Sequence, residues 1–307
     1  MISKNIHVAV LMGGKSAERE VSLISGNAVE KTLLNEGYRV TTIDVCKDLD
    51  SKLQKSRPDV VFNALHGRWG EDGCVQGLLE LLAIPYTHSG VTASAIAMNK
   101  ALAKGIFTAA GIRCPKGSIA NRYDILRGKI IKPPFVVKPI NQGSSVGVLI
   151  IQDESDLEPL KNKNWNWGDE VLIENYIPGR DIQVAVMGQK ALGAIEIRPK
   201  GKFYDYEAKY TQGKAEHIMP APINSKAYND ALEIALSAHF ALGCRSISRA
   251  DLRYDDSQGE PGKLFMLEIN TQPGLTPLSL FPEIAQNQGV SFNKLIEWLI
   301  EEARCDS

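Results

Sequence analysis

The sequence predicts an α/β protein with more than one subdomain, whose C-terminal part has α+β character. Three observations support this prediction. The chain has 307 residues, its first hundred residues alternate strand and helix patterns, and hairpin patterns appear only later. A chain of this length is too long for one small core, so two or three subdomains, or one large α/β domain, are expected.

The N-terminal part is predicted to contain a parallel sheet. Residues 6–12 form a near-continuous apolar run, typical of a strand covered on both faces. Further strands are predicted over 38–45 and 59–65. Ser16 is expected to cap an intervening helix, whose apolar positions have helical spacing. Those positions are Val21, Ile24, Ala28 and Leu33. The β-α-β-α-β order indicates parallel strands with right-handed crossovers.

A second unit follows. A long Ala-rich helix is predicted over about residues 92–110; it carries Lys100, and Gly111 is expected to end it. Strands are predicted over 135–138 and 171–176.

The last part of the chain begins with an antiparallel pattern. Residues 180–197 read as two strands around a hairpin centred on Gly188. The polar segment 198–222 is too long for a simple connection, and such loops are usually lids, binding loops or disordered segments. The remaining predicted elements are a helix and two strands, over 225–242, 246–254 and 263–271.

Composition excludes several classes of protein. The formal net charge of −1 argues against nucleic acid as the main partner. The first residues are expected to form a strand and not a signal peptide, and no apolar run approaches the roughly 18–20 residues of a membrane span. The five cysteines are scattered without a C-x-x-C pair, so neither a disulfide framework nor a zinc site is expected. A reduced, cytoplasmic setting fits this pattern.

The last two predicted strands carry a polar face. Side chains two residues apart share one face of a strand, so Arg249 lies with Asp251, and Glu268 with Asn270. If the strands pair as a hairpin, these four side chains gather among buried apolar ones. Oxygen ligands of this kind suit Mg²⁺ held together with substrate phosphates. A solvent-facing strand with salt bridges is the alternative for either strand alone.

The stretch VVKPINQGSSVGV, residues 136–148, suggests a phosphate site. Lys138 ends a strand, and the following Gly and Ser residues can turn backbone N–H groups and hydroxyls toward an anion. The stretch is not a P-loop. A single lysine is usually a solvated surface charge, but the strand ends of α/β sheets are where ligands bind.

Six segments in order resemble the D-alanine–D-alanine ligases of the ATP-grasp family, across essentially the whole chain. They are LMGGKSAEREVSLISG (11–26), HGRWGEDG (66–73), KPINQGSSVGV (138–148), YDYEAKY (204–210), SRADLRYD (248–255) and EINTQPGLTPLS (268–279). The resemblance implies an ATP-grasp fold of three subdomains. These are a Rossmann-like domain with a parallel sheet that binds the first D-alanine (1–97), a central subdomain (98–180), and a C-terminal subdomain with the metal and second D-alanine sites (181–307).

The resemblance also implies a nucleotide and metal site between the central and C-terminal units. Lys100 and Lys138 would contact the phosphates and purine surroundings of ATP, and Lys209 the γ-phosphate. Glu174 and Asp181 would serve the adenine–ribose side. The implied metal ligands are Asp251, Glu268 and Asn270, holding two Mg²⁺ ions, with Mn²⁺ also possible. The loop around residues 143–147 and the long loop near 200–217 would be lids.

For the amino acids, the resemblance implies that Glu18 recognises the ammonium of the first D-alanine. Glu18, Ser144 and Tyr210 would form a hydrogen-bonded chain, with His66 close to the same amino acid. A purely structural interpretation remains open for two of these residues: Glu18 would interact with the positive end of a helix dipole, and His66 would only stabilise the fold. The remaining implied roles are oxyanion stabilisation by Arg249 and the Gly274 N–H, and binding of the second carboxylate by Ser279 with Lys209.

The implied reaction is ATP-dependent formation of D-alanyl-D-alanine through a D-alanyl phosphate, for peptidoglycan precursors in the cytoplasm. The EAKY sequence that contains Tyr210 favours the dipeptide. Alternatives are a ligase that uses D-serine or D-lactate, and an inert nucleotide-binding scaffold on the same fold. D-alanine is the expected small-molecule partner, without nucleic acid or membrane, and a homodimer is expected.

Overall fold

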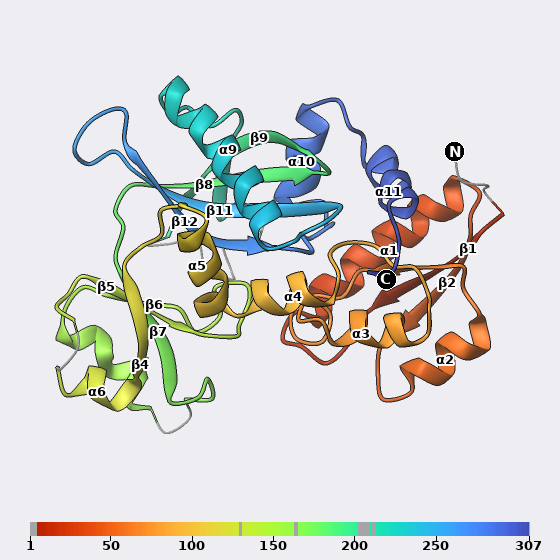
Figure 1. The fold of residues 1–307 in the computed structure, drawn as a ribbon, viewed down its shortest axis with the longest axis horizontal. Coiled ribbons are helices and arrows are strands. Elements are labelled where there is room, and N and C mark those ends of the chain that lie inside the picture. The colour runs from red at the N-terminus through yellow and green to blue at the C-terminus, as the bar shows by residue number, and fades with distance from the viewer. Residues whose placement is uncertain are drawn as a thin grey trace.

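The computed structural model describes residues 5–128, 131–162, 165–201, 209, 211 and 213–306. Within them the strands form a three-stranded, a four-stranded and a five-stranded sheet (Figure 1). The strands are β1 His7–Met12, β2 Arg39–Asp44, β3 Val60–Asn63, β4 Gly117–Asn121, β5 Phe135–Pro139, β6 Leu149–Ile151, β7 Glu170–Asn175, β8 Arg180–Met187, β9 Lys190–Pro199, β10 Ala215–Ile218, β11 Ile247–Asp255 and β12 Lys263–Asn270.

Helices cover these sheets, and no helix in the described ranges is long and apolar enough to cross a membrane. The helices are α1 Arg19–Asn35, α2 Leu49–Ser56, α3 Cys74–Leu81, α4 Val91–Met98, α5 Lys100–Ala109, α6 Arg122–Leu126, η1 Glu154–Leu157, α7 Glu158–Lys161, α9 Ser225–Ala241, α10 Leu280–Asn287 and α11 Phe292–Glu301.

The N-terminal sheet has the order β2-β1-β3 with parallel pairing, which confirms the prediction. Every residue of the central strand β1 is buried. Val8 and Val10 face a core shared with α1 and α11, whereas Ala9 and Leu11 face a second core with α2 and α3. This alternation is the two-residue period of a strand that is covered on both sides.

Helix α1 starts later than predicted. It begins at Arg19, and Glu18, not Ser16, is the N-cap residue. Ser16 still serves this helix end, because its Oγ accepts a hydrogen bond from the Glu18 N–H at 3.1 Å. Ile24 was expected on the buried face but is 51% exposed. Gly26 takes part in the contact with β1, where an added Cβ would lie 2.6 Å from the Met12 side chain.

The single helix predicted over 92–110 is wrong, because α4 ends at Met98 and α5 begins at Lys100. Asn99 between them has an extended backbone, and its side chain accepts a hydrogen bond from the Leu102 N–H. Asn is among the best N-cap residues, so it starts a new helix inside an Ala-rich pattern. The Lys100 N–H donates instead to the Ile140 carbonyl, which directs the start of α5 toward the central unit.

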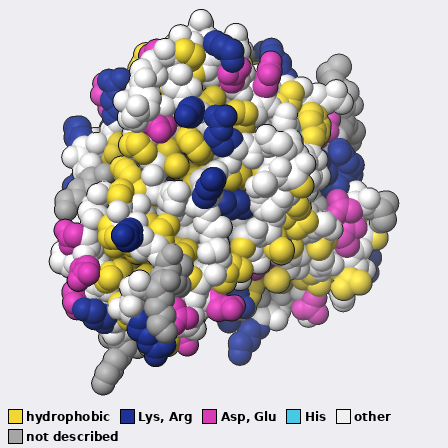
Figure 2. Space-filling view, turned by 60° about the vertical axis from the view of Figure 1, so that its left-hand side comes forward, with side chains coloured by type: hydrophobic (Ala, Val, Ile, Leu, Met, Phe, Trp, Pro, Cys, Tyr) yellow, Lys and Arg dark blue, Asp and Glu magenta, His cyan; other side chains and the backbone are white. Residues whose placement is uncertain are grey.

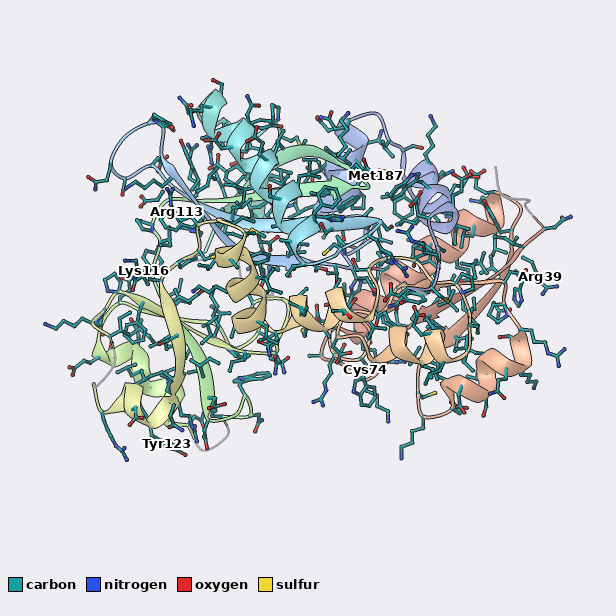
Figure 3. The ribbon with its side chains drawn as sticks, viewed as in Figure 1. Arg39, Cys74, Arg113, Lys116, Tyr123 and Met187 are labelled. Atoms are coloured by element: carbon teal, nitrogen blue, oxygen red, sulfur yellow. The ribbon has the colours of Figure 1, made fainter. Side chains whose placement is uncertain are left out.

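The central sheet has the order β4-β7-β5-β6 and is antiparallel. Its small core, with Phe135 and Val137, contains no residue of the other two sheets. In Figure 1 this sheet lies below the five-stranded one, and α5 stands between them. Arg113 and Lys116 lie on the segment that leads from α5 into this sheet (Figure 3).

The five-stranded sheet has the order β10-β9-β8-β11-β12, with antiparallel pairing throughout. The β8–β9 hairpin turns at Gly188, whose φ is +59°, as predicted. One face packs against α9, α4 and α5. On the opposite face, Ala185 and Met187 join the core of α1, α10 and α11. Met187 is labelled in Figure 3. The rest of that second face is turned toward the central sheet.

Candidate active site

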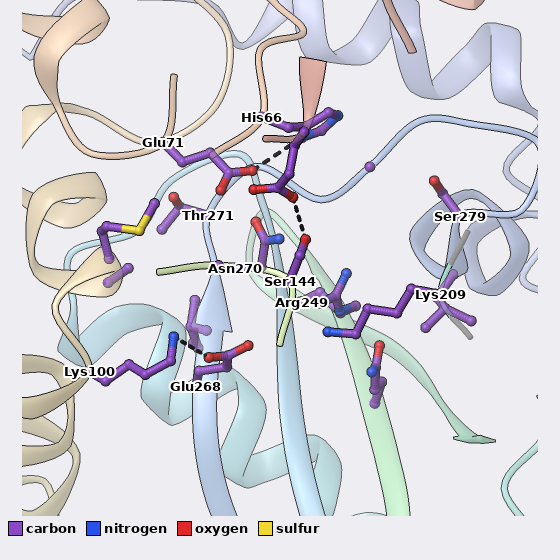
Figure 4. A pocket seen from close by; sticks show the side chains of 18 of the residues that line it. His66, Glu71, Lys100, Ser144, Lys209, Arg249, Glu268, Asn270, Thr271 and Ser279 are labelled. Carbon is purple, nitrogen blue, oxygen red and sulfur yellow. Dashed lines mark hydrogen bonds and ion pairs between the residues drawn. The ribbon is translucent and has the colours of Figure 1, made fainter. Parts of the chain in front are cut away.

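Two adjoining cavities lie on the face of the five-stranded sheet opposite α9. The larger one, of about 420 Å³, is lined by the central sheet on one side and by β8, β9, β11 and β12 on the other. The smaller one, of about 80 Å³, also reaches the N-terminal unit (Figure 4). Four residues line both cavities: Lys100, Gln183, Lys209 and Glu268. A volume of several hundred Å³ is typical of a small-molecule site, whereas the smaller cavity suits a much smaller ligand.

The paired strands β11 and β12 place their polar side chains as the residue pattern predicted. Asp251 is directly opposite Glu268, and Arg249 is opposite Asn270. The register shifts between Asp251 and Leu252, a type of irregularity that often re-aims side chains beside functional sites. The polar side chains of the two strands therefore share one face beside the cavities.

Cations neutralise both carboxylates of this pair. Lys100 Nζ lies 2.8 Å from Glu268 Oε2, and the Arg249 guanidinium binds both oxygens of Asp251 at 2.7 and 3.0 Å. Burial alone would raise the pKa of Glu268, but Lys100 and Lys209 outweigh it and lower that pKa to about 2. Burial lowers the pKa of Lys209 itself, while Asp251 and Glu268 oppose that change.

The oxygen atoms at this point fit a magnesium ion. Asp251 and Glu268 supply carboxylates, and the Asn270 Oδ1 accepts a backbone hydrogen bond from Gln272 at 2.8 Å. Among the described residues, no three or more His, Cys, Asp or Glu side chains are grouped so that they could hold a metal by themselves. The set at this point contains two such carboxylates and the Asn270 amide. Two carboxylates and an amide match the few protein ligands that Mg²⁺ usually takes beside substrate phosphates.

The larger cavity has a carboxylate held by two lysines. Glu174 receives Lys138 at 2.6 Å and Lys104 at 2.5 Å, and its own side chain is almost fully buried. Burial would raise the pKa of Glu174, but Lys138 and Lys104 lower it. Asp181, at the start of β8, pairs with Arg253 at 2.8 Å. On the face turned forward in Figure 2, Lys and Arg side chains gather near the middle among hydrophobic ones.

The smaller cavity has a buried acidic wall. The Ser144 hydroxyl donates to Glu18 Oε1, which joins the 143–147 loop to the N-terminal unit (Figure 4). His66 Nδ1 lies 3.1 Å from Glu71 Oε1, and its Nε2 lies 3.1 Å from Ser25 Oγ. Burial, together with repulsion from Glu71, raises the pKa of Glu18. A cation placed between Glu18 and Glu71 would relieve this repulsion.

Ser279 lies near Lys209 in the same cavity (Figure 4), and Gly274 lines that cavity too. Ser279 is the N-cap residue of α10, and its Oγ accepts the Thr276 N–H at 2.9 Å. A Cβ on Gly274 would come within 2.8 Å of the Ser279 Oγ. Tyr210, the third member of the predicted hydrogen-bonded chain, lies outside the described residues.

The chain matches two family models, one described as D-ala D-ala ligase N-terminus over residues 46–89 and one as D-ala D-ala ligase C-terminus over residues 125–301. The chain belongs to the D-alanine–D-alanine ligase family. The resemblance drawn from six sequence segments is thereby confirmed.

Relatives in this ligase family match over nearly their full length. The D-alanine–D-alanine ligase of Parvibaculum lavamentivorans is 52% identical over 99% of this chain and 100% of its own. The Bacillus anthracis D-alanine–D-alanine ligase complexed with ATP has a TM-score of 0.81 at 32% identity, covering 98% of this chain and 97% of its own. The VanG D-Ala:D-Ser ligase of Enterococcus faecalis has a TM-score of 0.80 at 28% identity, covering 97% and 99%. The predicted ATP-grasp fold is confirmed.

Several side chains of this ligase-family site were missed in the sequence. Lys104 follows Lys100 by one helical turn, and that spacing could have indicated a shared face. Glu71 stands inside the HGRWGEDG segment, only five positions after His66. Gln183 carried no signal, because a single Gln in an apolar strand is not distinctive.

Proposed function

We propose that this protein joins two molecules of D-alanine into D-alanyl-D-alanine at the expense of ATP, for cell-wall precursor synthesis. The observation that carries the proposal is the junction of a nucleotide-sized cavity with a small acidic cavity, through Lys100, Gln183, Lys209 and Glu268. A carboxylate is a poor electrophile until it is phosphorylated. The junction is where a phosphoryl group could pass from a nucleotide in one cavity to a carboxylate in the other.

The larger cavity is proposed to bind ATP. Glu174 and Asp181 stand at the side proposed for adenine and ribose, and Lys138, which pairs with Glu174, is proposed to contact the nucleotide as well. Lys100 and Lys209 then face the terminal phosphate at the junction. Cationic side chains with little exposure to water interact strongly with phosphoryl oxygens, because the surrounding dielectric is low.

Asp251, Glu268 and Asn270 are proposed to hold Mg²⁺, as two ions, with Mn²⁺ as a substitute. When bound, the ions would neutralise charge on the phosphoryl groups. Lys100 and Arg249 pair with the two carboxylates. On this proposal both cations can turn from the carboxylates toward the substrates.

The smaller cavity is proposed to bind the first D-alanine. Its ammonium would lie against Glu18, whose buried carboxylate beside Glu71 favours a nearby positive charge. His66, held by Glu71 and Ser25, would border the same amino acid. The carboxylate of D-alanine then points toward the junction and Lys209.

The second D-alanine is proposed to enter beside Ser279 and Lys209, which would bind its carboxylate. Its amine attacks the acyl phosphate, and the resulting oxyanion lies against Arg249 and the Gly274 N–H. Because an acyl phosphate hydrolyses in water, the 143–147 loop and the segment with Lys209 and Tyr210 must cover the site during reaction. Tyr210 would complete the chain from Glu18 through Ser144.

The subdomain limits 1–97, 98–180 and 181–307 remain part of the proposal. The separate core of the central sheet supports a mobile middle unit. The shared core of the N-terminal and five-stranded sheets supports a fixed relation between the two outer units. A cytoplasmic homodimer is proposed on the family relationship alone.

The test is ADP release with ATP, Mg²⁺ and either one amino acid (D-alanine, L-alanine or D-serine) or one pair (D-alanine with D-serine, or D-alanine with D-lactate). Turnover with D-alanine alone, and little with L-alanine, is the expected result. A D-alanine–D-serine ligase is the second candidate, favoured by the VanG structure. Turnover only in the presence of D-serine would replace the first proposal with this one, and no turnover with any pair would reject both.

A further inference from the structure

Gln183 is a buried amide at the junction of the two cavities. It lies on β8, is only 4% exposed, and lines both the larger and the smaller cavity. Its Oε1 has no hydrogen-bond partner among the described residues. A buried amide oxygen without a donor costs free energy, so such a group in a ligand cavity points to a donor that arrives with the ligand.

The register of the sheet shows what surrounds this amide. Gln183 is opposite Asp251, and Asp251 is in turn opposite Glu268, so the three side chains form one row across β8, β11 and β12. Lys100 lies on Glu268 and Arg249 on Asp251. The two carboxylates of the row are thus paired with cations. Within this row of described residues, the Gln183 amide oxygen is the acceptor without a donor.

The chemistry of the reaction limits which donor can arrive. Phosphoryl oxygens and carboxylates at neutral pH only accept hydrogen bonds. The ammonium of the first D-alanine lies at the Glu18 end of the smaller cavity, and the donors of adenosine lie near Glu174 in the larger one. The amine of the second D-alanine is the one substrate donor that must come to the junction itself, because it attacks the acyl phosphate there.

We propose that the Gln183 Oε1 accepts a hydrogen bond from this attacking amine and so orients it; the inference rests on the proposed ligase function. The nitrogen lone pair forms the new C–N bond, the C–O bond to phosphate breaks, and phosphate leaves with that electron pair. One N–H proton of the amine passes to the departing phosphate. Gln183 stays neutral, and its Oε1 keeps the hydrogen bond from the other N–H of the same nitrogen. The hydrogen bond strengthens as the nitrogen becomes positive, so it favours the transition state over the ground state.

The test compares two fates of one intermediate. Hydroxylamine traps the acyl phosphate as D-alanine hydroxamate, whereas D-alanine gives the dipeptide. Gln183→Met keeps the side-chain length and removes the acceptor. We expect the ratio of dipeptide to hydroxamate, measured in one sample, to fall roughly 10- to 100-fold, with the KM for ATP within about twofold of wild type. Because both products come from the same active molecules, this ratio does not depend on how much of the variant is folded.

A matched control is Ser246→Ala. The Ser246 Oγ is also buried without a partner among the described residues, and it lies beside β11 but in neither cavity. Its product ratio should equal that of wild type. An unchanged ratio in Gln183→Met, an equal loss of both products, or a raised KM for ATP alone would overturn the proposed contact. Wild-type protein that makes hydroxamate but no dipeptide, or neither, would instead refute the ligase function on which it rests.

Discussion

At the scale of single residues, Glu268 depends on its cations. Its pKa is depressed to about 2 from an ordinary value of 4.5. A carboxyl group with a depressed pKa stabilises the folded state above its ordinary pKa, and this contribution is lost as pH falls toward the folded value. We therefore expect the unfolding free energy of the wild type to decline between pH 4.5 and 2 partly through this group.

Glu268→Gln tests that contribution. The variant should be less stable than wild type at pH 6, because Lys100 loses its buried partner. The difference should shrink as pH falls toward 2, because wild-type Glu268 then becomes neutral as well. Urea unfolding at pH 6, 4 and 3 measures the two free energies. A difference that stays constant over this range would contradict the assigned pKa direction.

The same residue is expected to be essential for turnover. Glu268→Gln and Asp251→Asn each remove a negative oxygen from the proposed magnesium site, so ADP release should fall at least roughly 100-fold. A cooperative thermal unfolding transition at neutral pH, even at a lowered midpoint, would show that each variant still folds. Turnover restored to the wild-type rate at saturating Mg²⁺ would reject the assignment of these residues as ligands.

Lys104 is a second residue whose role follows from its contact. It binds one oxygen of Glu174 while Lys138 binds the other. Lys104→Met removes one of the two ion pairs that position the Glu174 carboxylate. The KM for ATP should therefore rise roughly 5- to 10-fold, with the KM for D-alanine unchanged. Steady-state kinetics with each substrate varied in turn separates the two. Lys294→Met, an exposed lysine on α11, is the control.

At the scale of elements, the break between α4 and α5 sets the direction of Lys100. Asn99→Ala removes the hydrogen bond to the Leu102 N–H and should cost about 1 kcal/mol of stability. The same change should also raise the KM for ATP, because Lys100 is the first residue of α5. Asn121→Ala is the matched control, since Asn121 caps α6 in the same way, through the Tyr123 N–H. If the two variants have the same KM for ATP, the break does not position Lys100.

Elements with a regular pattern of apolar residues could be predicted from the sequence. An element boundary that depends on one side chain, such as the Asn99 cap, could not. The parallel N-terminal sheet and the hairpin at Gly188 follow from apolar runs and turn residues. The polar face of β11 and β12 followed from counting every second residue. The start of α5 was missed because a capping Asn within an Ala-rich helix has no effect on the helical period.

Contacts between distant segments were inaccessible to pattern reasoning. The Gln272 side chain donates to the Leu65 carbonyl and accepts from Asn63 at 2.8 Å, which joins the C-terminal unit to the end of β3. Nothing in a single sequence indicates that these segments meet. The link between Ser144 and Glu18 came only from the family resemblance, and the structure shows the two side chains in contact.

At the scale of the whole molecule, the units are held together with different strength. The two outer units share a large apolar core and the Gln272 contacts, whereas the central sheet keeps its own core. At the C-terminal end, Arg245 binds the Cys305 carbonyl at 3.0 Å and Asp306 at 3.0 Å, and Asp306 also accepts the Val91 N–H. These contacts join the start of α4, in the N-terminal unit, to Arg245 of the C-terminal unit. We therefore expect the central unit to be the part that moves.

We expect closure of that central unit to depend on the hydrogen bond from Ser144 to Glu18. Ser144→Ala removes a group that lowers the pKa of Glu18, a residue whose pKa burial already raises. The carboxylate should then become protonated at a higher pH. We expect the acid limb of kcat/KM for the first D-alanine to move to higher pH, because only the ionised Glu18 pairs with the ammonium.

The same variant should also separate ATP consumption from ligation. A loop that closes less firmly admits water to the acyl phosphate, so the ratio of ADP to dipeptide should rise roughly two- to tenfold above the wild-type ratio. Ser118→Ala, at an exposed position on β4, controls for the loss of a hydroxyl in the central unit. A shifted acid limb with an unchanged product ratio would mean that Ser144 tunes Glu18 but does not close the site. If neither the acid limb nor the product ratio changes, closure relies on other contacts, and the proposed role of the Ser144–Glu18 link in closure is rejected.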